Sequence, residues 1–235
     1  MLLYKSNLAV FVIASVCLGV SLQAQELEVQ QARTDALNAP AGKMVGEVLD
    51  ASTGLHVYRG IPFAKPPIGE LRWRPPQPLG VWEGVRDCLE NGSQSVQTWQ
   101  GTAYGNEDCL YLNVWTHCAG KSDTKLPVMV WIHGGGWTGG NGSRPYYSGK
   151  AISRRGVILV TVNYRLGAMG FLAHQALSEE SERGISGNYG LMDNVLALQW
   201  IKKNIAAFGG DPENCLLYTS PSPRDQRGSR MPSSA

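Results

Sequence analysis

Three consecutive glycines, Gly134, Gly135 and Gly136, directly follow His133 and the apolar run of residues 128–132. A five-residue apolar run that stops at glycines is typical of a buried strand ending in a turn. Glycine has no Cβ, so its backbone N–H can lie close to a ligand. An ester carbonyl oxygen becomes negative during hydrolysis, and backbone N–H groups stabilise that charge. We interpret the glycines as an oxyanion loop; a flexible surface loop is the alternative.

The flanking sequence predicts the strands and helix that position this loop. Besides the run before His133, we expect strands over residues 43–50, 55–61, 110–116 and 157–162, and a helix over residues 191–208. Continuous apolar runs are typical of parallel strands covered on both faces. The apolar residues at helical spacing are Leu191, Val195, Leu198, Ile201, Ile205 and Phe208. The pattern predicts an α/β fold, with a mostly parallel sheet preceded by antiparallel N-terminal strands.

Residues 1–24 have the composition of a secretory signal peptide. Lys5 precedes an almost wholly apolar stretch over residues 8–20, and residues 22–24 fit a cleavage site. A membrane anchor would need a longer apolar run, and no other segment is long enough to span a bilayer. We therefore expect a secreted or periplasmic protein that has no membrane contact after cleavage.

Residues 215–235 differ in character from the patterned segment before them. They have no hydrophobic period, and their back-translation matches two parts of a transposase-end sequencing adapter in the correct order. We interpret them as an adapter-derived, non-native tail, which leaves residues 25–214 as the authentic mature sequence. A genuine Ser/Pro-rich tail is the alternative.

The charge balance excludes nucleic acid as an expected partner. The whole chain has 21 basic and 19 acidic residues, for a net charge of +2. The leader and the tail supply Lys5, Arg224, Arg227, Arg230 and Asp225, and without them 17 basic and 18 acidic residues remain. No basic stripe is left to bind phosphates. No metal-ligand cluster, phosphate loop or nucleotide fingerprint is present either, so we expect no metal and no cofactor.

Three cysteines lie outside the leader and the tail, namely Cys88, Cys109 and Cys118. Three is an odd number, so at least one of them is free or pairs outside this sequence. Exported proteins form disulfides readily. We expect one disulfide, between Cys88 and Cys109.

Motifs in a fixed order over residues 42–214 resemble the type B carboxylesterase family, which includes cholinesterases and bacterial carboxylesterases. They are GIPFAKPP (60–67) with LRWRP (71–75), EDCLYLNVW (107–115), HGGGW (133–137), NYRLG (163–167), GNYGLMD (187–193) and FGGDPEN (208–214). The resemblance implies the N-terminal portion of an α/β-hydrolase fold, truncated before the nucleophile elbow.

The resemblance also implies roles for single residues. Gly135 and Gly136 would supply two N–H donors to the oxyanion, and a third would follow the nucleophile. His133 and Gly134 would orient the loop.

Two structural ion pairs follow from the same resemblance. Arg72 would pair with Glu107, and Arg165 with Asp193. Arg165 leaves a buried strand and Asp193 begins a helix, so each needs a partner if it is buried. The alternative, in which Asp193 is the acid of a catalytic triad, ranks behind this structural role.

The family's serine, acid and catalytic histidine have no counterparts in this sequence. The family motif Gly-x-Ser-x-Gly does not follow Asn214, and Ser220 and Ser222 have no flanking glycines. Acyl transfer needs nucleophile, base and oxyanion donors together. We therefore expect this chain alone to be inactive and to fold poorly, and its full-length parent to hydrolyse small carboxylic esters through an acyl-enzyme.

A second class of function stays open. Some cholinesterase-like relatives are non-catalytic adhesion or binding proteins, and a binding module made of these residues alone is a third class. The intact HGGG motif favours an enzyme, because a binding protein has no chemical need for oxyanion donors. Trp99 lies ten residues before Cys109, the spacing of the choline-binding Trp of cholinesterases. Packing against its own loop is the favoured interpretation of Trp99.

Overall fold

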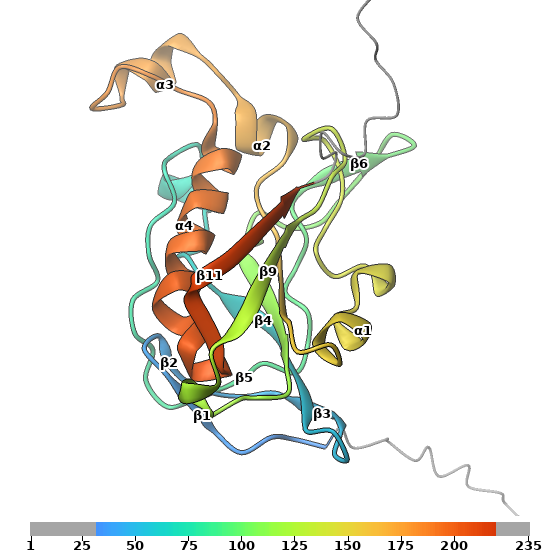
Figure 1. Ribbon diagram of the computed structural model, residues 1–235. Coiled ribbons are helices and arrows are strands. Elements are labelled where there is room, and N and C mark those ends of the chain that lie inside the picture. The colour runs from blue at the N-terminus through green and yellow to red at the C-terminus, as the bar shows by residue number, and fades with distance from the viewer. Residues whose placement is uncertain (1–31, 220–235) are drawn as a thin grey trace, which may run out of the picture. The chain divides into compact units, whose positions relative to one another are not determined.

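A six-stranded sheet organises residues 32–219, the part of the chain that this computed structural model describes (Figure 1). The leader, residues 1–24, and residues 220–235 of the tail lie outside the described residues. The strand order is β11–β9–β10–β8–β4–β3. These strands are β3 (Glu47–Asp50), β4 (Leu55–Pro62), β8 (Tyr111–Thr116), β9 (Leu126–Ile132), β10 (Ile158–Val162) and β11 (Gly210–Thr219).

The pairing of the strands changes along the sheet. The first strands, β3, β4 and β8, run antiparallel to their neighbours, and β8 is also antiparallel to β10. Parallel pairing joins β9 to β10 and to β11. Parallel neighbours require crossover connections, which here contain the helices of the fold. The predicted α/β class with antiparallel N-terminal strands is confirmed, and the described portion of the sheet is mixed.

Helices cover both faces of the sheet (Figure 1). The long helix α4 (Tyr189–Asn204) and the 3-10 turn η4 (Ile205–Phe208) pack over one face, and the short α1 (Lys150–Ser153) packs over the other. The core beneath α4 includes Val114, Val128, Val130, Val160, Ala197, Ile201 and Phe208. The remaining helical segments are η1 (Gly69–Leu71), η2 (Ser122–Thr124), η3 (Pro145–Tyr147), α2 (Gly167–Phe171) and α3 (Gln175–Glu179).

Only the second half of α4 buries the predicted apolar positions. Ile201 is buried as expected, whereas Leu191 and Val195 are exposed. The first turns instead bury Asp193 and Asn194. Asp193 binds Arg165 beneath the helix, and this contact turns a polar face of α4 toward the protein interior.

The predicted strand over residues 43–50 is divided into two strands. Residues Gly42–Val45 form β2 in a small sheet with β1 (Leu37–Ala39) and β5 (Val85–Asp87), and β3 joins the main sheet. The division lies at Gly46, where the chain passes so close to β4 that a Cβ would lie 2.5 Å from the Val57 carbonyl oxygen. A separate hairpin, β6 (Gln97–Trp99) with β7 (Thr102–Tyr104), stands beside the candidate site.

The predicted disulfide is wrong, because Cys88 and Cys109 are free thiols. Both are fully buried in the apolar cluster beneath α4. Burial raises the pKa of each thiol to about 12, so both stay protonated at neutral pH. They pack as small apolar side chains.

Residues 215–219 form the second half of β11. Leu216 and Leu217 pair in parallel register with Met129 and Val130 of β9. Their side chains are nevertheless 55% and 46% exposed. This pairing does not bear on where the residues come from, so the non-native origin of residues 215–235 stays a prediction.

Candidate active site

The glycine loop begins directly after β9, at the end of the sheet where the parallel strands finish. Gly135 and Gly136 have φ angles of +131° and +61°, in the region that side chains disfavour. A Cβ on Gly135 would lie 1.8 Å from the carbonyl oxygen of Gly139, so only glycine fits at this position. The loop therefore folds back on itself, with its backbone open to solvent.

His133 orients the first peptide of the loop. Its Nδ1 lies 2.9 Å from the carbonyl oxygen of Gly134 and holds that oxygen toward the ring. The C=O and N–H of a trans peptide point in opposite directions, so the N–H of Gly135 points away from His133. Burial lowers the pKa of His133, which keeps the ring neutral at neutral pH, with Nδ1–H as donor.

Tyr164 fixes His133 in turn. The two rings stack with centroids 4.6 Å apart, and the Tyr164 hydroxyl donates to the His133 carbonyl oxygen at 2.9 Å. Tyr164 lies two residues after the end of β10 and is itself buried. The ends of the neighbouring strands β9 and β10 are thus joined at the base of the loop.

Gln97 secures the far end of the loop. Its Oε1 accepts from the N–H of Gly140 at 2.8 Å, and its Nε2 donates to the Gly140 carbonyl at 3.0 Å. The same side chain accepts from the Tyr104 hydroxyl and donates to the Ser95 carbonyl. No local sequence pattern predicts this role for Gln97, because its partner Gly140 lies 43 residues further along the chain.

The N–H groups of Gly135 and Gly136 are available to a ligand. Within residues 32–219, neither donates a hydrogen bond to the protein. Both residues are exposed. Gly134 and Gly135 line a hollow of about 830 Å³, together with Gln97, Trp99, Tyr104, Arg144, Leu166 and Met169 among others. This volume lies within the usual range of small-molecule binding sites.

The Arg165–Asp193 pair supports the loop from below. Nε and Nη2 of Arg165 lie 2.8 and 2.7 Å from the two oxygens of Asp193, and both side chains are almost fully buried. The segment that follows Arg165 contacts the glycine loop directly, because the Gly167 N–H donates to the Trp137 carbonyl at 2.7 Å. Since both carboxylate oxygens bind Arg165, Asp193 is engaged as a structural partner and is not free to act as a triad acid.

Arg72 and Glu107 form the other predicted pair, at the surface. Nε and Nη2 of Arg72 each lie 2.6 Å from a Glu107 oxygen, and the side chains are 40% and 25% exposed. This bidentate contact ties the proline-rich segment to the residues before β8. It touches neither the glycine loop nor the hollow.

Two features are absent from residues 32–219. No group of three or more His, Cys, Asp or Glu side chains is arranged to hold a metal ion. No helix in this range has the length and apolar character needed to cross a bilayer.

Comparisons with known proteins agree on one family. The model of the carboxylesterase family matches residues 33–220. The chain is 45% identical over 195 residues to a fumonisin B1 esterase of Sphingopyxis macrogoltabida, covering 80% of this chain and 35% of that protein. It is 42% identical over 185 residues to a para-nitrobenzyl esterase of Bacillus subtilis, covering 75% and 36%.

The fold gives the same result. A carboxylesterase structure from Geobacillus stearothermophilus matches with a TM-score of 0.71 and 41% identity, covering 79% of this chain and 38% of that one. A para-nitrobenzyl esterase structure matches with a TM-score of 0.67. The chain therefore spans a little over a third of the length of the proteins that it matches.

Proposed function

Because the chain belongs to the carboxylesterase family, we propose that it carries the oxyanion-binding part of a secreted serine carboxylesterase. The observation that carries this proposal is the pair of unused N–H groups at Gly135 and Gly136, beside a hollow of small-ester size. His133 and Gln97 hold the loop from its two ends. Pre-oriented donors of this kind stabilise a developing negative charge without first having to reorganise.

The proposed reaction proceeds in two acyl transfers. A serine Oγ bonds to the ester carbonyl carbon and loses its proton to a histidine base, and the carbonyl oxygen becomes the oxyanion. The N–H groups of Gly135 and Gly136 donate to that oxygen. The C–O bond of the ester breaks, and the alcohol leaves with the proton. Water then hydrolyses the acyl-enzyme by the same steps, releasing the carboxylic acid.

The serine, the base and its acid belong, in this proposal, to sequence that follows Asn214 in the full-length parent. Export is part of the proposal too, and it rests on the composition of residues 1–24. Detection of the mature protein outside the cytoplasm, with Gln25 as its first residue, tests that part.

The first experiment is to sequence the source transcript through codon 214 from a primer that is independent of any adapter. We expect a Gly-x-Ser-x-Gly motif within roughly ten residues of Asn214. A reading frame in which the serine is replaced would favour the non-catalytic, cholinesterase-like binding protein instead. A genomic continuation through the sequence of residues 215–235 would overturn the assignment of the tail and leave the chain as an inactive short form.

The second experiment measures hydrolysis of short-chain acyl esters by the longer form. Gly136→Ala adds a methyl group next to one donor, and we expect kcat to fall by about 10²- to 10³-fold, as for loss of one oxyanion donor. Gly184→Ala is the matched control, because Gly184 has a φ of +65° and, like Gly136, nothing within 4 Å of an added Cβ. Equal activity of the two variants would contradict the role of Gly136.

A further inference from the structure

Arg144 is the one charged side chain among the described residues that line the hollow at the glycine loop. It also lines an adjoining hollow of about 600 Å³, with Trp99, Gln100, Thr102 and Tyr104. A single arginine in otherwise uncharged walls gives this site a positive character. A site of positive character attracts anionic ligands and repels cationic ones.

The Arg144 guanidinium lacks a carboxylate partner in residues 32–219, whereas Arg72, Arg74 and Arg165 each have one. Its one hydrogen bond there runs from Nη1 to the Tyr146 hydroxyl at 2.7 Å, and the guanidinium lies 5.8 Å from the Tyr146 ring centroid. A guanidinium has five N–H donors, arranged to bind a carboxylate through two parallel hydrogen bonds. Tyr146 thus positions the group and leaves most of its donors unused.

The charge of Arg144 also acts on His133, the residue that orients the glycine loop. Burial is the main cause of the lowered pKa of His133, and the positive charge of Arg144 adds to it. Arg144 lines the same hollow as Gly134 and Gly135, so its charge also acts on a ligand bound beside these glycines. The positive charge of Arg144 would attract a carboxylate on such a ligand and repel a cation.

We propose that this hollow selects esters that carry a carboxylate group, and that Arg144 binds this carboxylate while the ester carbonyl lies at Gly135 and Gly136. The proposal rests on the proposed function, because it assumes that the ester binds at the glycine loop. The proposal also argues against a choline-like cation at Trp99, because the positively charged guanidinium of Arg144 lines the same hollow as the Trp99 indole. The carboxylate can lie on the acyl or on the alcohol part of the ester.

The test is a titration of the longer form of the protein, with its proposed nucleophilic serine replaced by alanine so that no ester is hydrolysed, followed through the backbone amide signals of Gly135 and Gly136 in ¹H–¹⁵N spectra. Monomethyl succinate carries the carboxylate on its acyl part, O-acetylglycolate carries it on its alcohol part, and dimethyl succinate is the neutral control. We expect one of the two anions to bind about fivefold more tightly than dimethyl succinate, as for a solvent-accessible ion pair. The preference should shrink in high salt, and acetylcholine should bind more weakly than the neutral ester.

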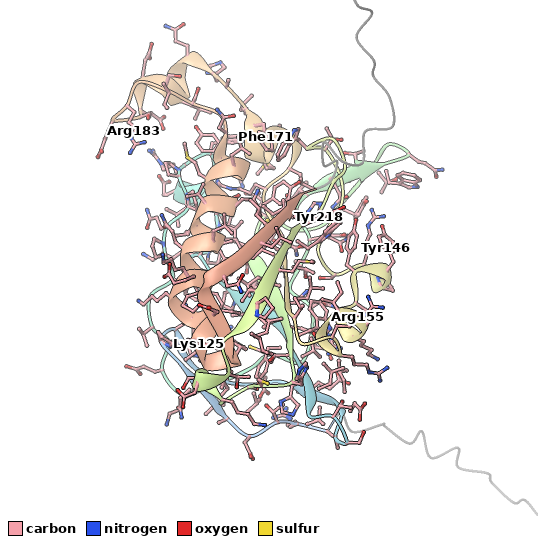
Figure 2. The ribbon with its side chains drawn as sticks, viewed as in Figure 1. Lys125, Tyr146, Arg155, Phe171, Arg183 and Tyr218 are labelled. Atoms are coloured by element: carbon pink, nitrogen blue, oxygen red, sulfur yellow. The ribbon has the colours of Figure 1, made fainter. Side chains whose placement is uncertain are left out.

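Arg144→Gln should abolish the preference for the anion, and Arg144→Lys should keep part of it. Arg183→Gln is the matched control, because it removes the same charge from an exposed arginine that does not line the hollow. Figure 2 shows Arg183 far from Tyr146, the residue that holds Arg144. In the longer form with its serine intact, the same preference should appear as a difference in kcat/KM between the esters.

Three outcomes would overturn the inference. The anions and the neutral ester could shift the glycine signals with equal affinity, Arg144→Gln could keep the preference, or Arg183→Gln could lose it to the same extent. The first outcome leaves the proposed function standing, because an ester would still bind at the glycine loop. If no ester shifts the signals of Gly135 and Gly136, the proposed function itself fails at this site.

Discussion

The glycine loop and strand β11 both adjoin β9, yet they are held in different ways. Buried polar groups hold the loop: Gln97 from a distant segment binds Gly140, His133 binds the adjacent Gly134 carbonyl, and the buried Arg165–Asp193 pair lies beneath. Strand β11 pairs with β9 through its backbone, while the side chains of Leu216 and Leu217 stay about half exposed. The difference shows that precise support is concentrated where the chemistry is proposed. Substitutions beneath the loop should therefore cost more than substitutions in β11.

The largest expected effect is at the ion pair beneath the loop. Asp193→Asn leaves the buried guanidinium of Arg165 without its countercharge, and we expect the free energy of unfolding to fall by about 3–5 kcal/mol. Urea denaturation, followed by tryptophan fluorescence, measures this loss.

The control for this prediction is the other ion pair. Glu107→Gln breaks a bidentate contact that is partly exposed, and we expect a loss of at most about 1 kcal/mol. Equal losses for the two variants would show that burial does not determine how much each ion pair contributes to stability. They would also contradict the expectation that substitutions beneath the loop cost more than substitutions elsewhere.

The second prediction separates two neighbouring glycines. In Gly135→Ala the new methyl group meets the Gly139 carbonyl in a disfavoured backbone region, and we expect about 2–3 kcal/mol of destabilisation. In Gly136→Ala the methyl group meets open space, so only the backbone strain of about 1–2 kcal/mol remains. Thermal unfolding of the two variants measures the difference. A larger loss for Gly136→Ala would contradict the loop geometry.

Local patterns along the sequence predicted the strands β4, β8, β9 and β10, but they gave no sign of β11, whose second half lies in the unpatterned tail. The apolar runs before His133 and Asn163 each form a strand; β10 is buried on both faces, whereas β9 is buried on one face and partly buried on the other. The backbone conformation of the glycine loop also depends on a local feature, because residues without a Cβ can adopt the positive φ angles of Gly135 and Gly136. Properties of this kind are set by residues adjacent in the chain.

Contacts between distant segments could not be predicted in the same way. Spacing alone places Leu191 and Val195 on the buried face of α4, but the Asp193 contact with Arg165 outweighs that pattern. The two cysteines expected to pair are instead free, protonated thiols in the core. Gln97 binds the loop at Gly140, 43 residues away in the sequence. A single glutamine in a polar stretch does not by itself predict such a contact.

The third prediction concerns acid. Burial lowers the pKa of His133 below 6.5 in the folded protein, so the unfolded chain binds this proton first as the pH falls. The contribution of His133 to stability is therefore complete above pH 6.5 and is lost below it, down to the folded pKa, at up to about 1.4 kcal/mol for each pH unit. Urea denaturation at a series of pH values measures this slope.

The control for the acid prediction is His56, which is only partly buried. Burial lowers the pKa of His56 as well, so each histidine should account for part of the slope. His133→Gln should remove the larger part and His56→Gln the smaller, because His133 is the more deeply buried of the two. A slope unchanged in His133→Gln would place the acid sensitivity outside the loop. Strand β11 contains no histidine and should not contribute.

The smallest effect is expected at Leu217 of β11, compared with its partner Val130 of β9. Val130 and Leu217 are register partners in the parallel ladder, so their side chains point to the same face of the sheet. Val130 is 1% exposed and Leu217 is 46% exposed. We expect Val130→Ala to lower the free energy of unfolding by about 2 kcal/mol, and Leu217→Ala by about 0.5 kcal/mol or less. Urea denaturation of the two variants measures the contrast. If Leu217→Ala cost as much as Val130→Ala, the half-exposed face of β11 would contribute to the core as fully as β9 does, and the distinction between a closely supported loop and a loosely covered strand would not hold.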